Sequence, residues 1–223
     1  PIYKNATFDL HDEKFWRENK SDLPLQGLSI LRRSRIEEEI FNKYFDLDKW
    51  ASYMAMLNAT ELFHGTVPKS VKFFLNPTTG LIEPIFFDGH YIGGLFGEFQ
   101  LTDFLNKDTK SIRCRWTCPN IYFYQMMFGN SSKVNSEFLI LYLKYLKNFS
   151  SEEYIKNTFK KYWDELSLAR GTIYREGYRR DAISSYGLLP HVGQFNRIKK
   201  RLIKIRAQIQ QSELLIPEHS FNS

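Results

Sequence analysis

Apolar residues recur at helical spacing in residues 47–57, directly after Asp46. A helix with this spacing carries one apolar face, made of Leu47, Trp50, Ala51, Met54 and Leu57. Asp46 is suited to the N-cap, because its carboxylate can accept a free backbone N–H of the first turn. Gly65 is suited to the left-handed residue that commonly ends a helix. The pattern therefore predicts a helix that starts after Asp46 and ends near Gly65.

The next segment contains two short apolar stretches, SVKFFL and LIEPIFF, on either side of NPTTG. Such stretches around a turn with Pro and Gly are typical of a β-hairpin. We expect an antiparallel hairpin over residues 71–87, with residues 76–80 as its turn. Pro84 has no backbone N–H and therefore needs an edge or a bulge. The second stretch runs directly into Asp88, where a carboxylate is costly unless something pairs with it.

The remaining elements are predicted to be helices. In the first thirty residues, one short helix is expected, near DEKFWRENK. A second helix is expected to start at Arg35, and a third is expected in CPNIYFYQMMFG. The segment SEFLILYLKYLKNF is apolar on most sides, so we expect it to be buried. Ser150 and Glu153 form a capping-box pattern before a long helix, and FNRIKKRLIKIRAQIQ predicts the last one. A strand-bearing part followed by a helical part predicts an α+β fold.

The composition limits the class of protein. The 223 residues suffice for one large domain or two small ones, and no apolar run reaches about 18 residues, the length of a transmembrane helix. The aromatic share of 16% predicts an aromatic-rich core. The formal net charge of +6 suits an acidic partner, a phosphate-rich ligand or an anionic surface, and does not by itself indicate nucleic acid.

Cys114 and Cys118 leave the redox environment open. Their spacing allows a small disulfide loop in an oxidising compartment, and two free thiols are an equal alternative. A structural zinc site would need two further ligands. Four glycosylation sequons, at Asn5, Asn58, Asn130 and Asn148, point weakly to secretion.

The last predicted helix is strongly basic. Its apolar stripe consists of Ile198, Leu202, Ile205 and Ile209, and six Lys and Arg residues surround that stripe. One interpretation is a helix docked on the core with a solvated basic face. The other is a docking surface for an acidic or phosphorylated partner or for a membrane. Nucleic-acid binding ranks below both, because no recognised nucleic-acid module accompanies the helix.

The order helix, loop, hairpin and acid is one that a kinase-like phosphotransfer site uses, with a base in the loop and a metal ligand after the hairpin. Asp88 is then the candidate Mg²⁺ ligand, and the alternative is a turn or N-cap aspartate. His64 is the only group between Asp48 and Asp88 that is suited to proton transfer at neutral pH, although it could equally cap a helix end. Glu83 lies on the opposite face of the strand from Asp88, so we do not expect it to be a second ligand.

Residues 45–89, FDLDKWASYMAMLNATELFHG and KFFLNPTTGLIEPIFFDG with the loop between them, resemble the CotH kinase family of spore-coat proteins. The resemblance rests on the ordered combination of the FDxDxFAxYxA helix, an aromatic strand, an NPxTG turn and a strand that ends in Asp. It implies an atypical protein kinase that uses ATP and Mg²⁺, with Asp88 as the metal ligand. Ser70 and Lys72 stand near the position of the family's catalytic-loop Asn, and we assign them to cofactor binding.

Two departures from the family pattern bear on activity. The family's loop supplies a catalytic Asp, whereas this chain has no Asp between Asp48 and Asp88. A second Asp, two residues after the first in many members, is replaced by His90. Both an active kinase and an inactive relative are therefore compatible with the sequence.

The resemblance also sets the expected organisation and function. Residues 1–44 are expected to be the end of a larger upstream region, and residues 45–223 to form a CotH-like C-terminal lobe. The part that grips the nucleotide is expected upstream, because its Lys and glycine-bearing hairpin are not found in residues 1–44. The expected activity is phosphate transfer from ATP to Ser or Thr of a surface or coat protein, by a secreted or cell-surface protein. The alternative is a catalytically inactive structural or interaction protein with an acidic partner as one candidate; nucleic acid is not expected as a partner.

Overall fold

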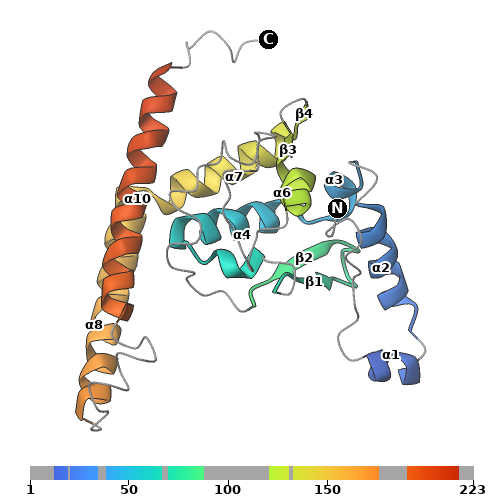
Figure 1. Cartoon of the computed structure of the whole chain (residues 1–223), viewed down its shortest axis with the longest axis horizontal. Helices are drawn as coiled ribbons and strands as arrows, with labels where there is room; N and C mark the ends of the chain where they lie inside the picture. The colour runs from blue at the N-terminus through green and yellow to red at the C-terminus, as the bar shows by residue number, and fades with distance from the viewer. Residues whose placement is uncertain are drawn as a thin grey trace. The chain divides into compact units, whose positions relative to one another are not determined.

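The computed structural model describes residues 13–19, 21–34, 39–66, 70–87, 121–130, 133–175 and 190–215. The chain divides into two compact units, Pro1–Leu143 and Lys144–Ser223. The elements of the first unit are α1 (Glu13–Asn19), α2 (Leu23–Arg33), α3 (Glu39–Tyr44), α4 (Leu47–Thr60), a 3₁₀ helix η2 (Phe63–Thr66), β1 (Lys72–Leu75), β2 (Ile82–Ile85), α6 (Ile121–Phe128), β3 (Gly129–Asn130) and β4 (Lys133–Val134). Helix α7 (Ser136–Phe149) crosses the division, and α8 (Glu152–Arg175) and α10 (Pro190–Leu215) belong to the second unit (Figure 1).

The fold is mostly helical with short antiparallel hairpins, so the α+β prediction is confirmed at this level. The helix predicted near DEKFWRENK is α1. Helix α2 was not predicted, because its stretch is mixed in polarity; it buries only Gly27 and Leu31. The small β3–β4 hairpin was not predicted either.

Helix α4 begins as its sequence predicts. The Asp46 carboxylate accepts the backbone N–H of Lys49 at 3.0 Å, and Trp50, Ala51, Met54 and Leu57 are buried. The prediction for its C-terminus was wrong. The left-handed residue is Glu61, with φ of 60°, and the N–H groups of Glu61 and Leu62 donate to the carbonyls of Asn58 and Leu57 in a Schellman pattern.

Strands β1 and β2 form the predicted hairpin. Lys72 pairs with Ile85, Phe73 with Pro84, and Leu75 with Ile82 in an antiparallel register. The turn is closed by the N–H of Gly80, which donates to the Asn76 carbonyl at 2.8 Å, and Gly80 has a φ of +70° that favours glycine. Pro84 is tolerated because, among the described residues, β1 and β2 form a sheet of two strands, and β2 has on its other side a single bridge, from Phe45 to Ile82.

The carbonyl of Ile82 fixes the hairpin to the start of α4. It accepts the backbone N–H of Asp46 at 3.0 Å and the indole N–H of Trp50 at 2.9 Å. On the surface, the ammonium of Lys49 lies 3.2 Å from Asp46 Oδ2 and 2.7 Å from Glu83 Oε1. Figure 1 shows α4 next to this hairpin. We call this arrangement of α4, β1 and β2 the helix–hairpin frame.

Aromatic side chains fill the core of the first unit, as the composition predicts. Phe41, Phe45 and Trp50 are buried on the side of the helix–hairpin frame, and Phe128 and Phe138 are buried on the side of α6 and α7. The rings of Phe41 and Phe138 join the two groups at a centroid distance of 5.3 Å.

Helix α7 buries only one of its faces, and the prediction that it would be buried was therefore too broad. Phe138 and Tyr142 are buried, whereas Ile140 is 67% exposed and Leu143 is 39% exposed. The exposed leucine and isoleucine made the segment look apolar on most sides. Apolar content alone thus overstated how much of this helix the fold covers.

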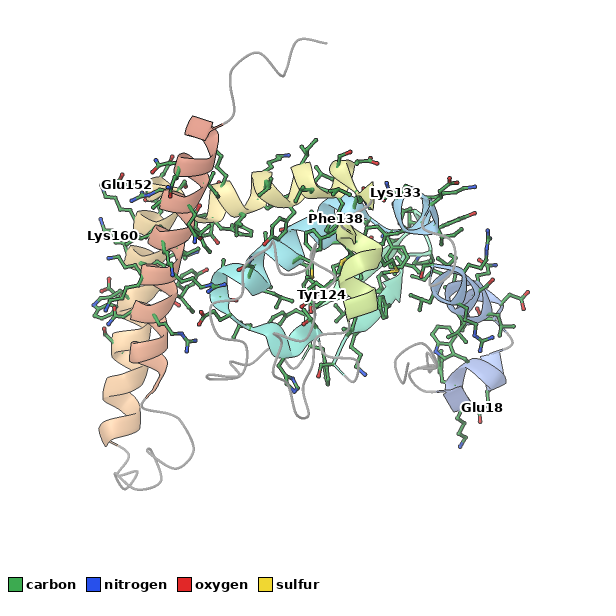
Figure 2. The ribbon with its side chains drawn as sticks, turned by 45° about the horizontal axis from the view of Figure 1, so that its top comes forward. Glu18, Tyr124, Lys133, Phe138, Glu152 and Lys160 are labelled. Carbon is green, nitrogen blue, oxygen red and sulfur yellow. The ribbon has the colours of Figure 1, made fainter. Side chains whose placement is uncertain are left out.

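The second unit contains a pair of antiparallel helices. Ile155 of α8 and Leu202 and Ile205 of α10 are buried, and the two helices contact each other (Figure 2). The N-cap of α8 is Ser151, whose hydroxyl accepts the N–H of Tyr154 at 3.1 Å; the predicted capping box at Ser150 was one residue early. Throughout the described ranges, no helix combines the length and the apolarity needed to cross a bilayer.

Candidate functional site

The loop between α4 and β1 brings together two of the predicted site residues. Ser70 Oγ and His64 Nδ1 lie 3.2 Å apart, a hydrogen bond whose direction depends on the imidazole tautomer. His64 sits on η2, the single 3₁₀ turn that follows α4. A hydroxyl beside an imidazole is the arrangement that activates nucleophiles and transfers protons.

Both members of this pair are buried, which limits what they can do in this conformation. Ser70 is 0% exposed and His64 is 3% exposed. A general base must lie within hydrogen-bond reach of the proton that it removes. A substrate hydroxyl would reach His64 only if the loop opened, so the pair serves as a packing contact in the observed state.

Two tyrosines that the sequence reasoning missed hold this loop in place. The Tyr53 hydroxyl donates to the Gly65 carbonyl at 3.1 Å, and the Tyr124 hydroxyl donates to Thr66 Oγ1 at 2.6 Å. Burial raises the pKa of the Tyr53 phenol to about 12. Burial also raises the pKa of the Tyr124 phenol, and its hydrogen bond to Thr66 partly opposes this effect. Both phenols therefore remain protonated donors at neutral pH.

Tyr53 had a detectable signal, because it follows Trp50 by three residues on the buried side of α4. Tyr124 had none, since its partner Thr66 is 58 residues away in the sequence.

Lys72 lies at the open end of the hairpin. Its ammonium sits 4.9 Å from the centre of the Phe87 ring, a cation–π distance. Lys72 is paired with Ile85 across the hairpin, and Phe86 and Phe87 continue beyond β2 with exposed fractions of 51% and 48%. The cation is thereby held beside the residue that precedes Asp88.

The principal candidate, Asp88, lies outside the described residues, as do His90, Cys114 and Cys118. Its role as a metal ligand stays a prediction. Within the described ranges, no three His, Cys, Asp or Glu side chains gather as a metal site would require.

Glu83, which was not expected to be a second metal ligand, forms other interactions. Its carboxylate makes an ion pair with Lys49 at 2.7 Å and accepts a hydrogen bond from the Asn76 amide at 2.7 Å. The hydrogen bond from Lys49 is the main reason that the pKa of Glu83 lies below its ordinary value of 4.5.

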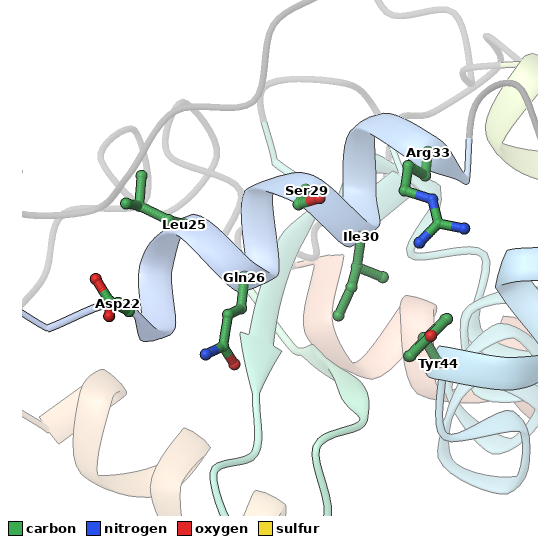
Figure 3. A pocket seen from close by; sticks show the side chains of 7 residues that line it. All are labelled: Asp22, Leu25, Gln26, Ser29, Ile30, Arg33 and Tyr44. Carbon is green, nitrogen blue, oxygen red and sulfur yellow. The ribbon is translucent and has the colours of Figure 1, made fainter.

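A pocket of about 470 Å³ lies on another part of the first unit (Figure 3). It runs along one side of α2, with Tyr44 of α3 opposite Ile30 and Arg33. None of His64, Ser70 and Lys72 lines it. This pocket therefore adds nothing to the predicted phosphotransfer site.

Comparison of the chain with protein-family models, with curated proteins and with solved structures gave no match. The resemblance to the CotH family consequently rests on the residues of the helix–hairpin frame and on Asp88.

Proposed function

We propose that the chain is the C-terminal lobe of a CotH-like atypical protein kinase, which binds ATP and Mg²⁺ and transfers phosphate to Ser or Thr of a surface or coat protein. The observation that carries the proposal is the position of Lys72, whose ammonium lies over the ring of Phe87. Asp88 is the next residue. A cation held beside the residue that precedes a carboxylate offers the two kinds of group that ATP phosphates and their Mg²⁺ require.

In this proposal Asp88 supplies an oxygen ligand to Mg²⁺, a metal that is typically held by one or two carboxylates together with substrate phosphates. Lys72 neutralises charge on the phosphates, and Ser70 supports the loop beside it. His64 would accept the proton of the substrate hydroxyl after the loop opens. Two hydrogen bonds to the Ile82 carbonyl, from the Asp46 N–H and the Trp50 indole, fix β2 to the start of α4, and Asp88 follows the last residue of β2 by three positions.

The alternative is a catalytically inactive kinase-like protein that binds a surface or coat partner. The burial of His64 and Ser70 favours it, because neither group can contact a substrate in the observed conformation.

Thermal shift of the full-length protein with and without ATP and Mg²⁺ tests the proposal. We expect ATP with Mg²⁺ to raise the melting temperature, since a ligand at about 100 times its Kd stabilises by about 2.7 kcal/mol. Asp88→Asn and Lys72→Ala should lose the shift and keep the fold. Lys43→Ala is the matched control, because Lys43 lies 5.2 Å from the Tyr44 ring in an equivalent cation–π contact.

The outcomes separate the two functions. A shift that Lys43→Ala retains and Asp88→Asn loses supports nucleotide binding, and transfer of labelled γ-phosphate to protein then distinguishes a kinase from an inactive relative. The absence of any ATP-dependent shift in the intact protein would contradict the kinase and leave the interaction protein as the better explanation.

A further inference from the structure

The positive charge of the chain belongs to its second unit. Residues 144–223 contain 15 Lys and Arg against 8 Asp and Glu, whereas residues 1–143 contain 16 against 17. The first unit is therefore close to neutral, and the second is strongly basic. An anionic partner would be attracted to the second unit.

Several of these cations share one side of the α8–α10 pair. Arg206 of α10 lies 3.6 Å from Glu152 of α8, which identifies the sides of the two helices that meet there. On α8, residues 156, 160 and 163 follow Glu152 at intervals of 4, 8 and 11, so their side chains point to the same side. On α10, residues 199 and 203 precede Arg206 by 7 and 3, which places them on its side as well. We call this side the basic face; it consists of Lys156, Lys160, Trp163, Lys199, Ile203 and Arg206, together with one acid, Glu152.

The basic face is directed away from the core of the helix pair. Ile155, Leu202 and Ile205 of the two helices are buried, while Lys156, Lys160 and Lys199 are exposed. Figure 2 labels Glu152 and Lys160 along the same outer edge of α8. Among the described residues, the basic face has one ion pair, between Arg206 and Glu152. The Glu152 side chain is 88% exposed. A pair with one so exposed partner contributes little stability, and the Arg206 side chain keeps 31% of its surface exposed.

Two large apolar side chains lie among these cations. Trp163 is 45% exposed and Ile203 is 41% exposed. A soluble polyanion gives an isoleucine no apolar environment. The boundary between headgroups and acyl chains of a bilayer accepts apolar side chains while its phosphates attract lysines, and tryptophan is enriched at this boundary.

We propose that the basic face docks on the surface of an anionic phospholipid bilayer. Lys156, Lys160, Lys199 and Arg206 bind the lipid phosphates and carboxylates, and Trp163 and Ile203 enter the interface. This inference is independent of the proposed kinase activity, because it uses only residues of the second unit.

Co-sedimentation of the full-length protein with vesicles tests the proposal. We expect binding to vesicles of phosphatidylcholine mixed with phosphatidylserine and none to pure phosphatidylcholine. The double variant Lys160→Glu/Lys199→Glu should bind about tenfold more weakly or worse, since each basic residue near the surface contributes severalfold to affinity. Lys14→Glu/Lys43→Glu makes the same charge change on exposed lysines of the first unit and should bind as the wild type does.

The apolar contribution separates a bilayer from a soluble polyanion. Ile203→Ser should weaken vesicle binding, while Ile140→Ser, at a side chain of α7 that is 67% exposed, should not. Circular dichroism confirms that each variant is folded. The proposal is overturned if the wild type does not bind the anionic vesicles, if both double variants lose binding equally, or if Ile203→Ser has no effect while polyglutamate or a short DNA duplex displaces the vesicles.

Discussion

Gly65 illustrates how a residue can be needed for a reason other than the one its type suggests. Glycine after a helical pattern indicates a left-handed C-terminal residue, yet Glu61 takes that conformation. A Cβ at Gly65 would lie 2.9 Å from the Tyr53 hydroxyl oxygen, the same hydroxyl that donates to the Gly65 carbonyl. The requirement at Gly65 is therefore space, and a contact with Tyr53, twelve residues earlier, cannot be deduced from local pattern.

This contact predicts the effect of Gly65→Ala. We expect a loss of about 1–3 kcal/mol in the free energy of unfolding, the usual cost of adding a methyl group to a filled site. The double variant Tyr53→Phe/Gly65→Ala lacks the hydroxyl oxygen that clashes with the added methyl group. The double variant should therefore have nearly the same free energy of unfolding as Tyr53→Phe alone. Urea unfolding measures both effects.

Gly27→Ala is the control for the glycine substitution. Its added Cβ would meet Leu75 at 3.6 Å, an ordinary contact, and alanine is favoured over glycine inside a helix by roughly 0.5–1 kcal/mol. We expect Gly27→Ala to be neutral or stabilising. Equal losses for the two variants would contradict the role given to Tyr53.

Among the elements, those with strong local signals were predictable from the sequence. The carboxylate of Asp46 and the apolar spacing after it predict α4, and the NPTTG turn predicts the hairpin. For the candidate site, the sequence placed His64 and Ser70 in one loop but could not predict their hydrogen bond or their burial. The residues that follow His64 are held by Tyr53 and Tyr124, which come from other elements and cannot be read from the loop's own sequence.

The surface link between α4 and β2 predicts a dependence of stability on pH. The pKa of Glu83 is lowered in the folded state, chiefly by its hydrogen bond with Lys49. The unfolded chain then binds more protons than the folded one in the range just below pH 4.5. The contribution of Glu83 to the free energy of unfolding is therefore complete above that range, and it is lost as the pH falls through the pKa of Glu83 in the folded state. We expect the free energy of unfolding to decline on acidification, and to decline less in Glu83→Gln.

Urea unfolding at a series of pH values from neutral to acidic measures this difference. Glu39→Gln removes one acidic group from an exposed position of α3 and should keep the wild-type dependence. If the free energy of unfolding depends on pH in the same way in Glu83→Gln and Glu39→Gln, the ion pair between Glu83 and Lys49 does not stabilise the folded state.

At the scale of the whole molecule, long-range contacts decide how a short motif should be interpreted. The sequon at Asn58 indicates a glycosylation site by its three letters alone. In the fold, Asn58 is buried on α4 and its amide donates to the hydroxyl of Tyr142, 84 residues away. Asn148, in contrast, is exposed on α7.

We therefore expect the folded protein, secreted from a glycosylating host, to be modified at Asn148 and unmodified at Asn58. A glycan on Asn58 would remove the hydrogen bond with Tyr142 and could not fit in the core. Peptide mass spectrometry after enzymatic deglycosylation in heavy-oxygen water reads the occupancy of each site. Secreted, folded protein that carries a glycan on Asn58 would contradict the packing of α4 against α7.

The helix–hairpin frame also has a consequence for the order in which the chain folds during synthesis. Its bond between Trp50 and Ile82 spans 32 residues, whereas the bonds from Thr66 to Tyr124 and from Asn42 to Asn135 span 58 and 93. Shorter loops close at lower entropic cost, and the frame is complete when the ribosome has released residue 87. A nascent chain at that stage would hold its frame while the apolar surface that later meets Phe138 is still bare. A chain of this length would therefore offer that apolar surface to a chaperone.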